Sequence, residues 1–132
     1  MSLLAGIKEI TSGDIKVQEP MKNHTSLRIG GPADFLVIPQ SISETRELLL
    51  FCRKEFIPLF VFGGGTNLLV SDKGIRGIAV KMEKPFRGIS FDGSEVTVGA
   101  GLPLPLLASY VGQEGLSGLE FAAGIPGTVG GA

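Results

Sequence analysis

The sequence predicts an α+β fold that contains two short α/β units. In the first, an apolar run over 33–38 and another over 59–62 flank a helical pattern, which is the order of a β-α-β unit. In the second, short apolar runs separated by turn signals come before one further helical pattern. We therefore expect a first domain over 1–83 and a second over 84–132.

The first domain is expected to begin with a short helix, because residues 3–10 carry apolar side chains at helical spacing. An extended segment over 15–21 should follow. Ser41 and Glu44 then have the spacing of a capping box, and Pro58 closes the helix that they begin. Four side chains of this helix are expected to form its buried face: Leu48, Leu49, Cys52 and Phe56.

Strands and turns are expected to alternate after the second apolar run. Residues 68–72 are apolar and bounded by turn residues, so they predict a strand rather than a helix. Asp92-Gly93 is a hairpin signal. A helix is expected over 104–111, ended by Gly112 and Gly115. Three further strands are expected, over 78–82, 88–91 and 95–98.

Composition excludes several classes of protein. The charges are interspersed and sum to −1, which gives no basic stripe for nucleic acid. Apolar runs are far shorter than the ~20 residues of a membrane helix, and no signal peptide is evident. We therefore expect a cytoplasmic protein with no nucleic-acid and no membrane partner. The single cysteine excludes an internal disulfide, and the single histidine, His24, supports no metal site.

Two glycine-rich loops carry the main functional signal. Residues 63–67 (Gly-Gly-Gly-Thr-Asn) follow an apolar run, and residues 124–132 (Gly-Ile-Pro-Gly-Thr-Val-Gly-Gly-Ala) are the last of the sequence. Without Cβ atoms, backbone N–H groups can converge on an anion. Two such loops suggest a ligand that has a diphosphate and a flat ring and is held by main chain. Flavin fits this description better than nicotinamide.

The spacing of residues around the first loop does not match two other glycine-rich phosphate-binding motifs. A Rossmann fingerprint needs a third glycine where this chain has Leu68, and a Walker A loop ends in Gly-Lys-Ser/Thr where this one ends in Gly-Thr-Asn. Phosphate binding would therefore occur without a helix dipole, in a strand–loop–strand arrangement. A glycine-rich hairpin with no ligand remains the alternative for the first loop taken alone.

Four segments together resemble the UDP-N-acetylenolpyruvoylglucosamine reductase (UDP-N-acetylmuramate dehydrogenase) family. They are residues 24–33 (His-Thr-Ser-Leu-Arg-Ile-Gly-Gly-Pro-Ala), 63–70 (Gly-Gly-Gly-Thr-Asn-Leu-Leu-Val), 118–120 (Gly-Leu-Glu) and 124–132. Their order and spacing match the family from about residue 20 onward. The Thr-Val-Gly-Gly-Ala ending is similar to that of the shorter, second type in the family.

The resemblance implies an FAD-binding fold of two α/β subdomains, of which the second is truncated here. It implies an enzyme that uses NADPH and FAD to convert the UDP-sugar UDP-N-acetylglucosamine-enolpyruvate to UDP-N-acetylmuramate, in peptidoglycan precursor synthesis. Family members are about twice this length or more. We therefore expect the substrate domain and the catalytic arginine, serine and glutamate to be absent from these residues, and the chain alone to be inactive.

The resemblance also assigns residues to non-covalently bound FAD. Five should cradle its diphosphate: Gly63, Gly64, Gly65, Thr66 and Asn67. Seven should line the flavin ring or allow its close approach: Gly124, Ile125, Pro126, Gly127, Thr128, Gly130 and Gly131. Arg28 is either a phosphate neighbour or a solvated charge, while His24 and Glu120 are expected to be structural. Cys52, Tyr110 and the phenylalanines are expected in the core.

Two alternatives remain open at this point. Another FAD oxidoreductase of the same superfamily, such as a sugar or lactone oxidase, would share the first glycine loop. It should lack the ending Ile-Pro-Gly-Thr-Val-Gly-Gly-Ala in this context. A non-enzymatic nucleotide-binding module is the second alternative, and the length of the reading frame beyond Ala132 distinguishes it from a reductase fragment.

Overall fold

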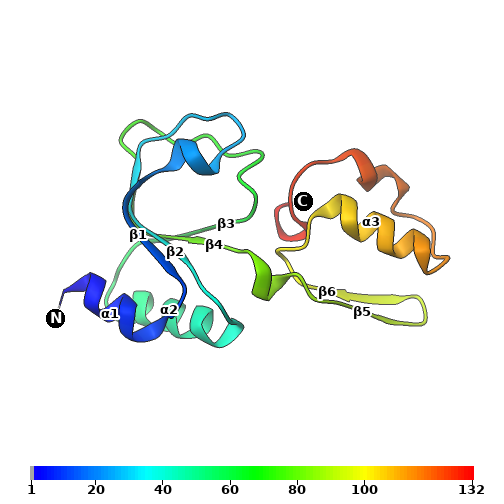
Figure 1. The fold of residues 1–132 in the computed structure, drawn as a ribbon, viewed down its shortest axis with the longest axis horizontal. Coiled ribbons are helices and arrows are strands. Elements are labelled where there is room, and N and C mark those ends of the chain that lie inside the picture. Colours follow the sequence, from blue (N-terminus) through cyan, green and yellow to red (C-terminus); the bar gives the residue numbers. More distant parts are fainter. Residues whose placement is uncertain (1) are drawn as a thin grey trace.

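The structure is a computed structural model that describes residues 2–132, and it confirms the α+β class (Figure 1). The helices are α1 (Leu3–Ile10), α2 (Ile42–Lys54) and α3 (Leu104–Gln113). The strands are β1 (Asp14–Pro20), β2 (Pro32–Ile38), β3 (Leu59–Phe62), β4 (Ile75–Lys81), β5 (Ile89–Asp92) and β6 (Glu95–Val98). Short 3-10 helices are η1 (Met21–His24), η2 (Lys84–Phe86), η3 (Glu120–Gly124) and η4 (Val129–Gly131).

A four-stranded sheet with the order β1-β2-β4-β3 organises the first part of the chain. β1 runs antiparallel to β2, whereas β4 is parallel to both of its neighbours. The predicted β-α-β order therefore exists, but β4 lies between the two strands that α2 connects. This arrangement places the end of β3, and the glycine loop that follows it, at the edge of the sheet.

Each face of this sheet has its own apolar core, because side chains alternate between faces along a strand. Helices α1 and α2 cover one face, where Ile7, Leu48 and Cys52 pack against Val37, Ile78 and Val80. The other face is covered by the 3-10 helix η1 and by the loop after β3 instead of by an α-helix. There the buried residues are Met21, Ala33, Leu36, Phe62, Val70 and Ala79.

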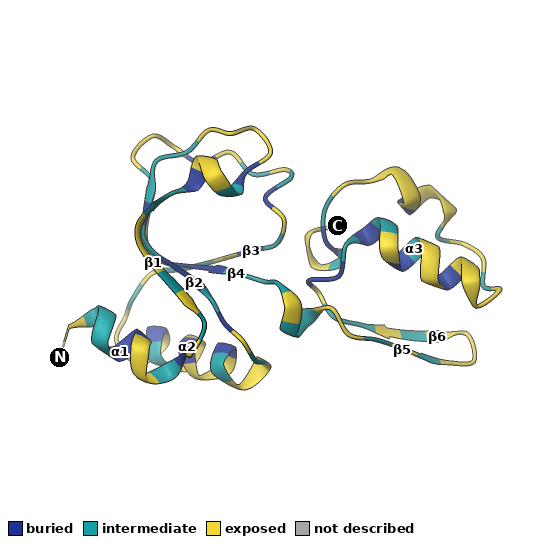
Figure 2. Cartoon of the chain, in the orientation of Figure 1, coloured by how far each residue is buried: buried dark blue, intermediate teal, exposed yellow. Residues whose placement is uncertain are grey.

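The second part of the chain packs a hairpin against α3. β5 and β6 pair antiparallel around Gly93, which has a φ of +59°, so the predicted hairpin is confirmed. Leu102, Leu104, Leu107, Val111 and Ala122 form the buried centre of this part, and Figure 2 shows buried positions along the inner side of α3. The boundary proposed near residues 83–85 stays a prediction.

The strand predicted over 68–72 is wrong. This segment is irregular, and its apolar run is only partly covered, since Val70 is buried and Leu69 is exposed. Among residues 2–132, its one backbone hydrogen bond to a neighbouring segment is donated by the Gly31 N–H to the Ser71 carbonyl, at 2.9 Å. A short apolar run that packs partly on the sheet therefore resembles a strand in the sequence but forms no ladder of backbone hydrogen bonds.

The buried face predicted for α2 is partly wrong. Thr45, Leu48 and Cys52 form the buried stripe, whereas Leu49 is exposed because it lies about 100° around the helix from Leu48. Phe56 lies beyond the helix end, has a φ of +53° and is 93% exposed. Phe121 and Tyr110 are also exposed, so the expectation that all phenylalanines and Tyr110 belong to the core is wrong.

The cap of α2 differs in one bond from the predicted capping box. The Ser41 hydroxyl accepts the Glu44 N–H at 3.0 Å, as expected. The Glu44 carboxylate, however, accepts the Gln40 N–H at 2.8 Å and the Thr11 hydroxyl at 2.6 Å. It therefore joins the start of α2 to the end of α1, and these hydrogen bonds lower the pKa of Glu44 to about 2.

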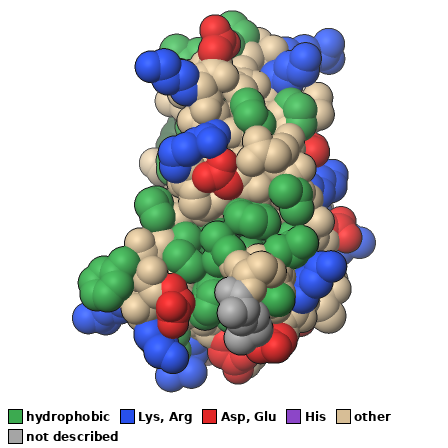
Figure 3. Space-filling view, turned by 90° about the vertical axis from the view of Figure 1, so that its left-hand side faces the viewer, with side chains coloured by type: hydrophobic (Ala, Val, Ile, Leu, Met, Phe, Trp, Pro, Cys, Tyr) green, Lys and Arg blue, Asp and Glu red, His purple; other side chains and the backbone are tan. Residues whose placement is uncertain are grey.

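On the face shown in Figure 3, basic and acidic side chains are interspersed, and hydrophobic side chains gather in the lower part. Among the helices of residues 2–132, none is long and apolar enough to cross a membrane.

Candidate functional site

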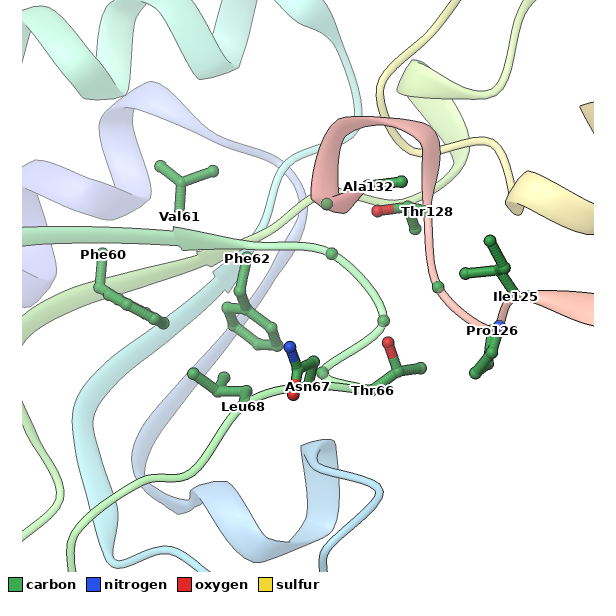
Figure 4. A pocket seen from close by; sticks show the side chains of 15 residues that line it. Phe60, Val61, Phe62, Thr66, Asn67, Leu68, Ile125, Pro126, Thr128 and Ala132 are labelled. Carbon is green, nitrogen blue, oxygen red and sulfur yellow. The ribbon is translucent and has the colours of Figure 1, made fainter. Parts of the chain in front are cut away.

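The two glycine-rich loops lie on opposite sides of one cavity of about 550 Å³ (Figure 4). The first loop continues β3 beyond the sheet, and the second comes back from the part of the chain that contains α3. Ten of the twelve residues assigned to FAD line this cavity: Gly63, Gly64, Gly65, Thr66, Asn67, Ile125, Pro126, Gly127, Thr128 and Gly131. Gly124 and Gly130 do not, although they belong to the same loop.

Five lining residues were missed by the sequence analysis: Phe60, Val61, Phe62, Leu68 and Ala132. Phe60 and Phe62 occupy alternate positions of β3, so their rings point to the same side, with centroids 6.1 Å apart. They form an apolar wall next to the first glycine loop. The alternation of aromatic residues in the strand before the loop was the signal that could have identified them.

The two loops contact each other through paired glycine and threonine residues. A Cβ atom on Gly63 would collide with Thr128 Oγ1, and one on Gly127 would lie 3.0 Å from Thr66 Oγ1. Each threonine therefore packs against a glycine of the opposite loop. Gly63 is required for this close approach between loops, independently of any ligand.

Gly64 and Gly65 have different surroundings. Gly65 adopts a φ of +66°, and a Cβ atom there would collide with the His24 carbonyl oxygen. The Gly65 carbonyl in turn accepts the Ser26 N–H at 3.0 Å, so the loop rests on the 24–26 segment. Gly64 faces open space, where an added Cβ atom would meet only Thr66 Cγ2, at 3.6 Å.

The first loop presents unpaired backbone donors. Within residues 2–132, the N–H groups of residues 63–67 donate to no protein acceptor. The residues that line the cavity also include no charged side chain. An anion in this cavity would therefore be held by main-chain N–H groups, which is the chemistry of an anion-binding nest. Residues 68–74, which follow Asn67, are not helical, so no helix dipole contributes at this loop.

This donor set and shape fit FAD. The row of free N–H groups suits a diphosphate, and the open side of Gly64 leaves room for its close approach. The apolar wall of Phe60 and Phe62 and the backbone of residues 125–128 suit the apolar surfaces of a flat ring.

The remaining candidate residues lie away from the cavity. Arg28 is exposed, with a φ of +54°, and Glu120 accepts the Gly118 N–H at 2.9 Å. His24 lies 2.8 Å from Glu19, and its hydrogen bond lowers the pKa of that carboxyl. Cys52 is buried, which raises the pKa of its thiol. In the described part of the chain, no three His, Cys, Asp or Glu residues are grouped to hold a metal ion.

Comparison with known proteins identifies the family. The FAD binding domain family matches residues 33–132. A UDP-N-acetylenolpyruvoylglucosamine reductase from Syntrophomonas wolfei is 50% identical over 118 residues, which cover 89% of this chain and 40% of that protein. The crystal structure of UDP-N-acetylenolpyruvylglucosamine reductase from Thermus caldophilus is 36% identical, with a TM-score of 0.68, over 91% of this chain and 40% of that one.

A more distant structure shares the fold alone. The BBE-like 1 protein of Physcomitrella patens superposes with a TM-score of 0.61 at 17% identity, over 85% of this chain and 26% of that one. The chain spans about 40% of the length of the curated relative from Syntrophomonas wolfei. This chain belongs to the FAD binding domain family, and within it is similar to the FAD-binding portion of UDP-N-acetylenolpyruvoylglucosamine reductases.

Proposed function

We propose that this chain is the FAD-binding part of an NADPH-dependent reductase that converts UDP-N-acetylglucosamine-enolpyruvate to UDP-N-acetylmuramate in the cytoplasm, for peptidoglycan precursor synthesis. One observation carries the proposal. Two glycine loops from opposite halves of the chain line one uncharged cavity, and one of them offers a row of free N–H groups. The similarity to the named reductases supplies the reaction.

The first loop is proposed to hold the diphosphate. The N–H groups of residues 63–67 would donate to its oxygens, and the Thr66 hydroxyl and the Asn67 amide could add side-chain hydrogen bonds. Because these donors are mostly backbone, their positions depend on the conformation of the loop rather than on flexible side chains.

The second loop is proposed to border the flavin ring, with residues 125–128 across the cavity from the first loop. Bound FAD supplies the hydride-transfer chemistry, while the protein binds and orients it. The residues that line the cavity include no Asp, Glu, His, Cys, Lys or Tyr. This portion of the protein is therefore proposed to bind the cofactor and to transfer no proton itself.

The test uses the full-length protein. Purified protein should carry a yellow cofactor that denaturation releases, that chromatography identifies as FAD, and that does not remain attached to the polypeptide. Adding the enolpyruvyl UDP-sugar should start NADPH consumption, with a product heavier by two hydrogens. An FAD protein that instead oxidises a free sugar or lactone without NADPH would support the oxidase alternative. Protein that binds no flavin would contradict the whole proposal.

A further inference from the structure

We propose that the Glu19–His24 pair is a positioning pair for the diphosphate loop: it fixes the segment on which Gly65 rests. The inference rests on the proposed function, because it assigns to the pair an effect on FAD affinity. Neither residue lines the cavity, so the pair would act through the backbone and not by touching the cofactor.

The first step is the hydrogen bond between the two side chains. His24 Nε2 lies 2.8 Å from Glu19 Oε1, and the two side chains are only 9% and 18% exposed. Lys16 Nζ also lies near this carboxylate, at 3.8 Å. The hydrogen bond from His24 lowers the pKa of Glu19, so the carboxylate stays ionised at neutral pH and accepts the imidazole N–H. A charge-assisted bond that is largely shielded from water holds the two side chains in one geometry.

The second step leads from His24 to the loop. The His24 carbonyl oxygen occupies the place that a Cβ atom on Gly65 would take, and two residues later Ser26 donates its N–H to the Gly65 carbonyl. The 24–26 segment therefore forms the floor of the loop. A shift of this floor would move Gly65, and with it the free N–H groups of the loop that lines the cavity.

The third step concerns what holds the floor in place. The start of η1 is fixed to the chain ahead of β2, since Met21 and Lys22 donate their N–H groups to the carbonyls of Gly31 and Gly30. At the other end of η1, the ring of His24 provides the link to Glu19. Glu19 belongs to β1 and pairs with Ala33 of β2. The pair thus connects the loop floor to the sheet.

The experiment compares three variants of the full-length protein. His24→Ala removes the pair, His24→Gln keeps a side-chain N–H that can donate to Glu19, and Glu44→Gln is the control. Glu44 makes a comparable set of side-chain hydrogen bonds, but it does so between α1 and α2, among residues that do not line the cavity. Its substitution lowers stability without touching the loop floor.

Two measurements are made on each variant. Flavin fluorescence titration should give an FAD Kd that rises about tenfold for His24→Ala, the loss of roughly one charge-assisted hydrogen bond, and less than about threefold for His24→Gln. Hydrogen exchange of the apo protein should accelerate at the Ser26 N–H, which donates to the Gly65 carbonyl, in His24→Ala and stay close to wild type there in His24→Gln and Glu44→Gln.

The outcomes separate the inference from the proposed function. Wild-type protein that binds no FAD would contradict the proposed function, whereas exchange in the apo protein would still test the positioning role. An FAD Kd within about twofold of wild type for His24→Ala would overturn the inference. So would faster exchange spread evenly over the chain, because that pattern indicates a general loss of stability.

Discussion

Gly63 and Thr128 lie side by side with no room for a side chain between them, although they belong to loops from opposite halves of the chain. A Cβ atom at position 63 would collide with Thr128 Oγ1 and would come within 3.1 Å of its Cγ2. Thr128 is almost fully buried, so its side chain has little space in which to move away. This contact sets the distance between the two loops that line the cavity.

Gly63→Ala should therefore push the loops apart and lower the thermal midpoint, by an amount that reflects about 1–3 kcal/mol of overpacking. Thr128→Ala removes the atoms that would collide. The double variant should then be more stable than the sum of the two single effects predicts. Thermal unfolding followed by circular dichroism gives the three midpoints. If the effects of the two substitutions on the thermal midpoint were strictly additive, positions 63 and 128 would not be in steric contact.

Gly65→Val should prevent FAD binding, because the left-handed φ and the His24 carbonyl leave no place for a branched side chain. The strain should also lower stability by about 1–3 kcal/mol, but the sheet and its two cores should survive. Flavin absorbance after purification measures binding, and circular dichroism measures folding. Normal flavin content in this variant would mean that the loop does not hold the diphosphate.

Gly64→Ala is the matched variant at the neighbouring position. Its Cβ atom would meet nothing closer than Thr66 Cγ2 at 3.6 Å, so the apo protein should keep its thermal midpoint. Because Gly64 lines the cavity, the added methyl group would take up part of the space proposed for the diphosphate, and FAD affinity should fall. Titration of both variants with FAD separates two effects. Gly64→Ala changes only the space available to the ligand, whereas Gly65→Val also changes the conformation of the loop.

Glu44→Gln should make the free energy of unfolding depend less on pH in the acidic range. Hydrogen bonds from Thr11 and Gln40 lower the pKa of Glu44 from an ordinary 4.5 to about 2. The ionised carboxylate therefore stabilises the fold above pH 4.5, and this stabilisation is lost as the pH falls from 4.5 toward 2. The variant should be less stable at neutral pH, by roughly 1 kcal/mol because the site is partly exposed.

Urea unfolding at several pH values measures this difference. The gap between wild type and Glu44→Gln should be constant from pH 7 to about pH 5 and should close toward pH 2. A gap that is the same at all these pH values would show that the carboxylate contributes only through packing.

The sequence predicted most elements, because local signals and tertiary packing agree over them. Residues 3–10 are a helix, and both strands that flank α2 lie where the apolar runs predicted them. The failures have a common physical cause. At Leu49 and Phe56 apolar side chains face solvent, and at 68–72 a short apolar run is partly buried without strand pairing. The apolar character of a residue does not by itself show whether the rest of the protein covers its side chain.

At the candidate site too, the sequence predicted the local elements but not the contacts between distant segments. Glycine runs identified both loops, but nothing local in the sequence links residue 63 to residue 128, and their contact exists only because the chain folds back. The floor under Gly65 was also beyond the reach of sequence patterns. His24 was expected to be structural, and its carbonyl contact with Gly65 depends on a left-handed φ that the glycine permits.

The 132-residue chain alone should not turn over the enolpyruvyl substrate. Its cavity is lined by uncharged residues, so no side chain there can give or take a proton at neutral pH. Purified chain supplied with FAD, NADPH and the substrate should leave the NADPH absorbance unchanged, while full-length protein serves as the positive control. Measurable turnover by the chain would place the essential residues within these 132 positions.

The same chain should bind FAD weakly. Its free N–H groups remain available for the diphosphate, but tight flavin binding also requires that the apolar ring be buried. Several apolar residues that line the cavity are still open to water, since Val61 is 48% exposed and Ile125 is 42% exposed. The ordering of glycine-rich loops costs conformational entropy, which a partly covered ring offsets poorly.

Isothermal titration of the purified chain with FAD tests this expectation directly. We expect weak or undetectable binding, and we expect residues after Gly115 to exchange amide hydrogens faster than β2 and β4 do. Full-length protein titrated in parallel provides the reference affinity. A submicromolar Kd at one-to-one stoichiometry would contradict the prediction, because the loops and the apolar wall of Phe60 and Phe62 would then be a sufficient flavin site without further cover.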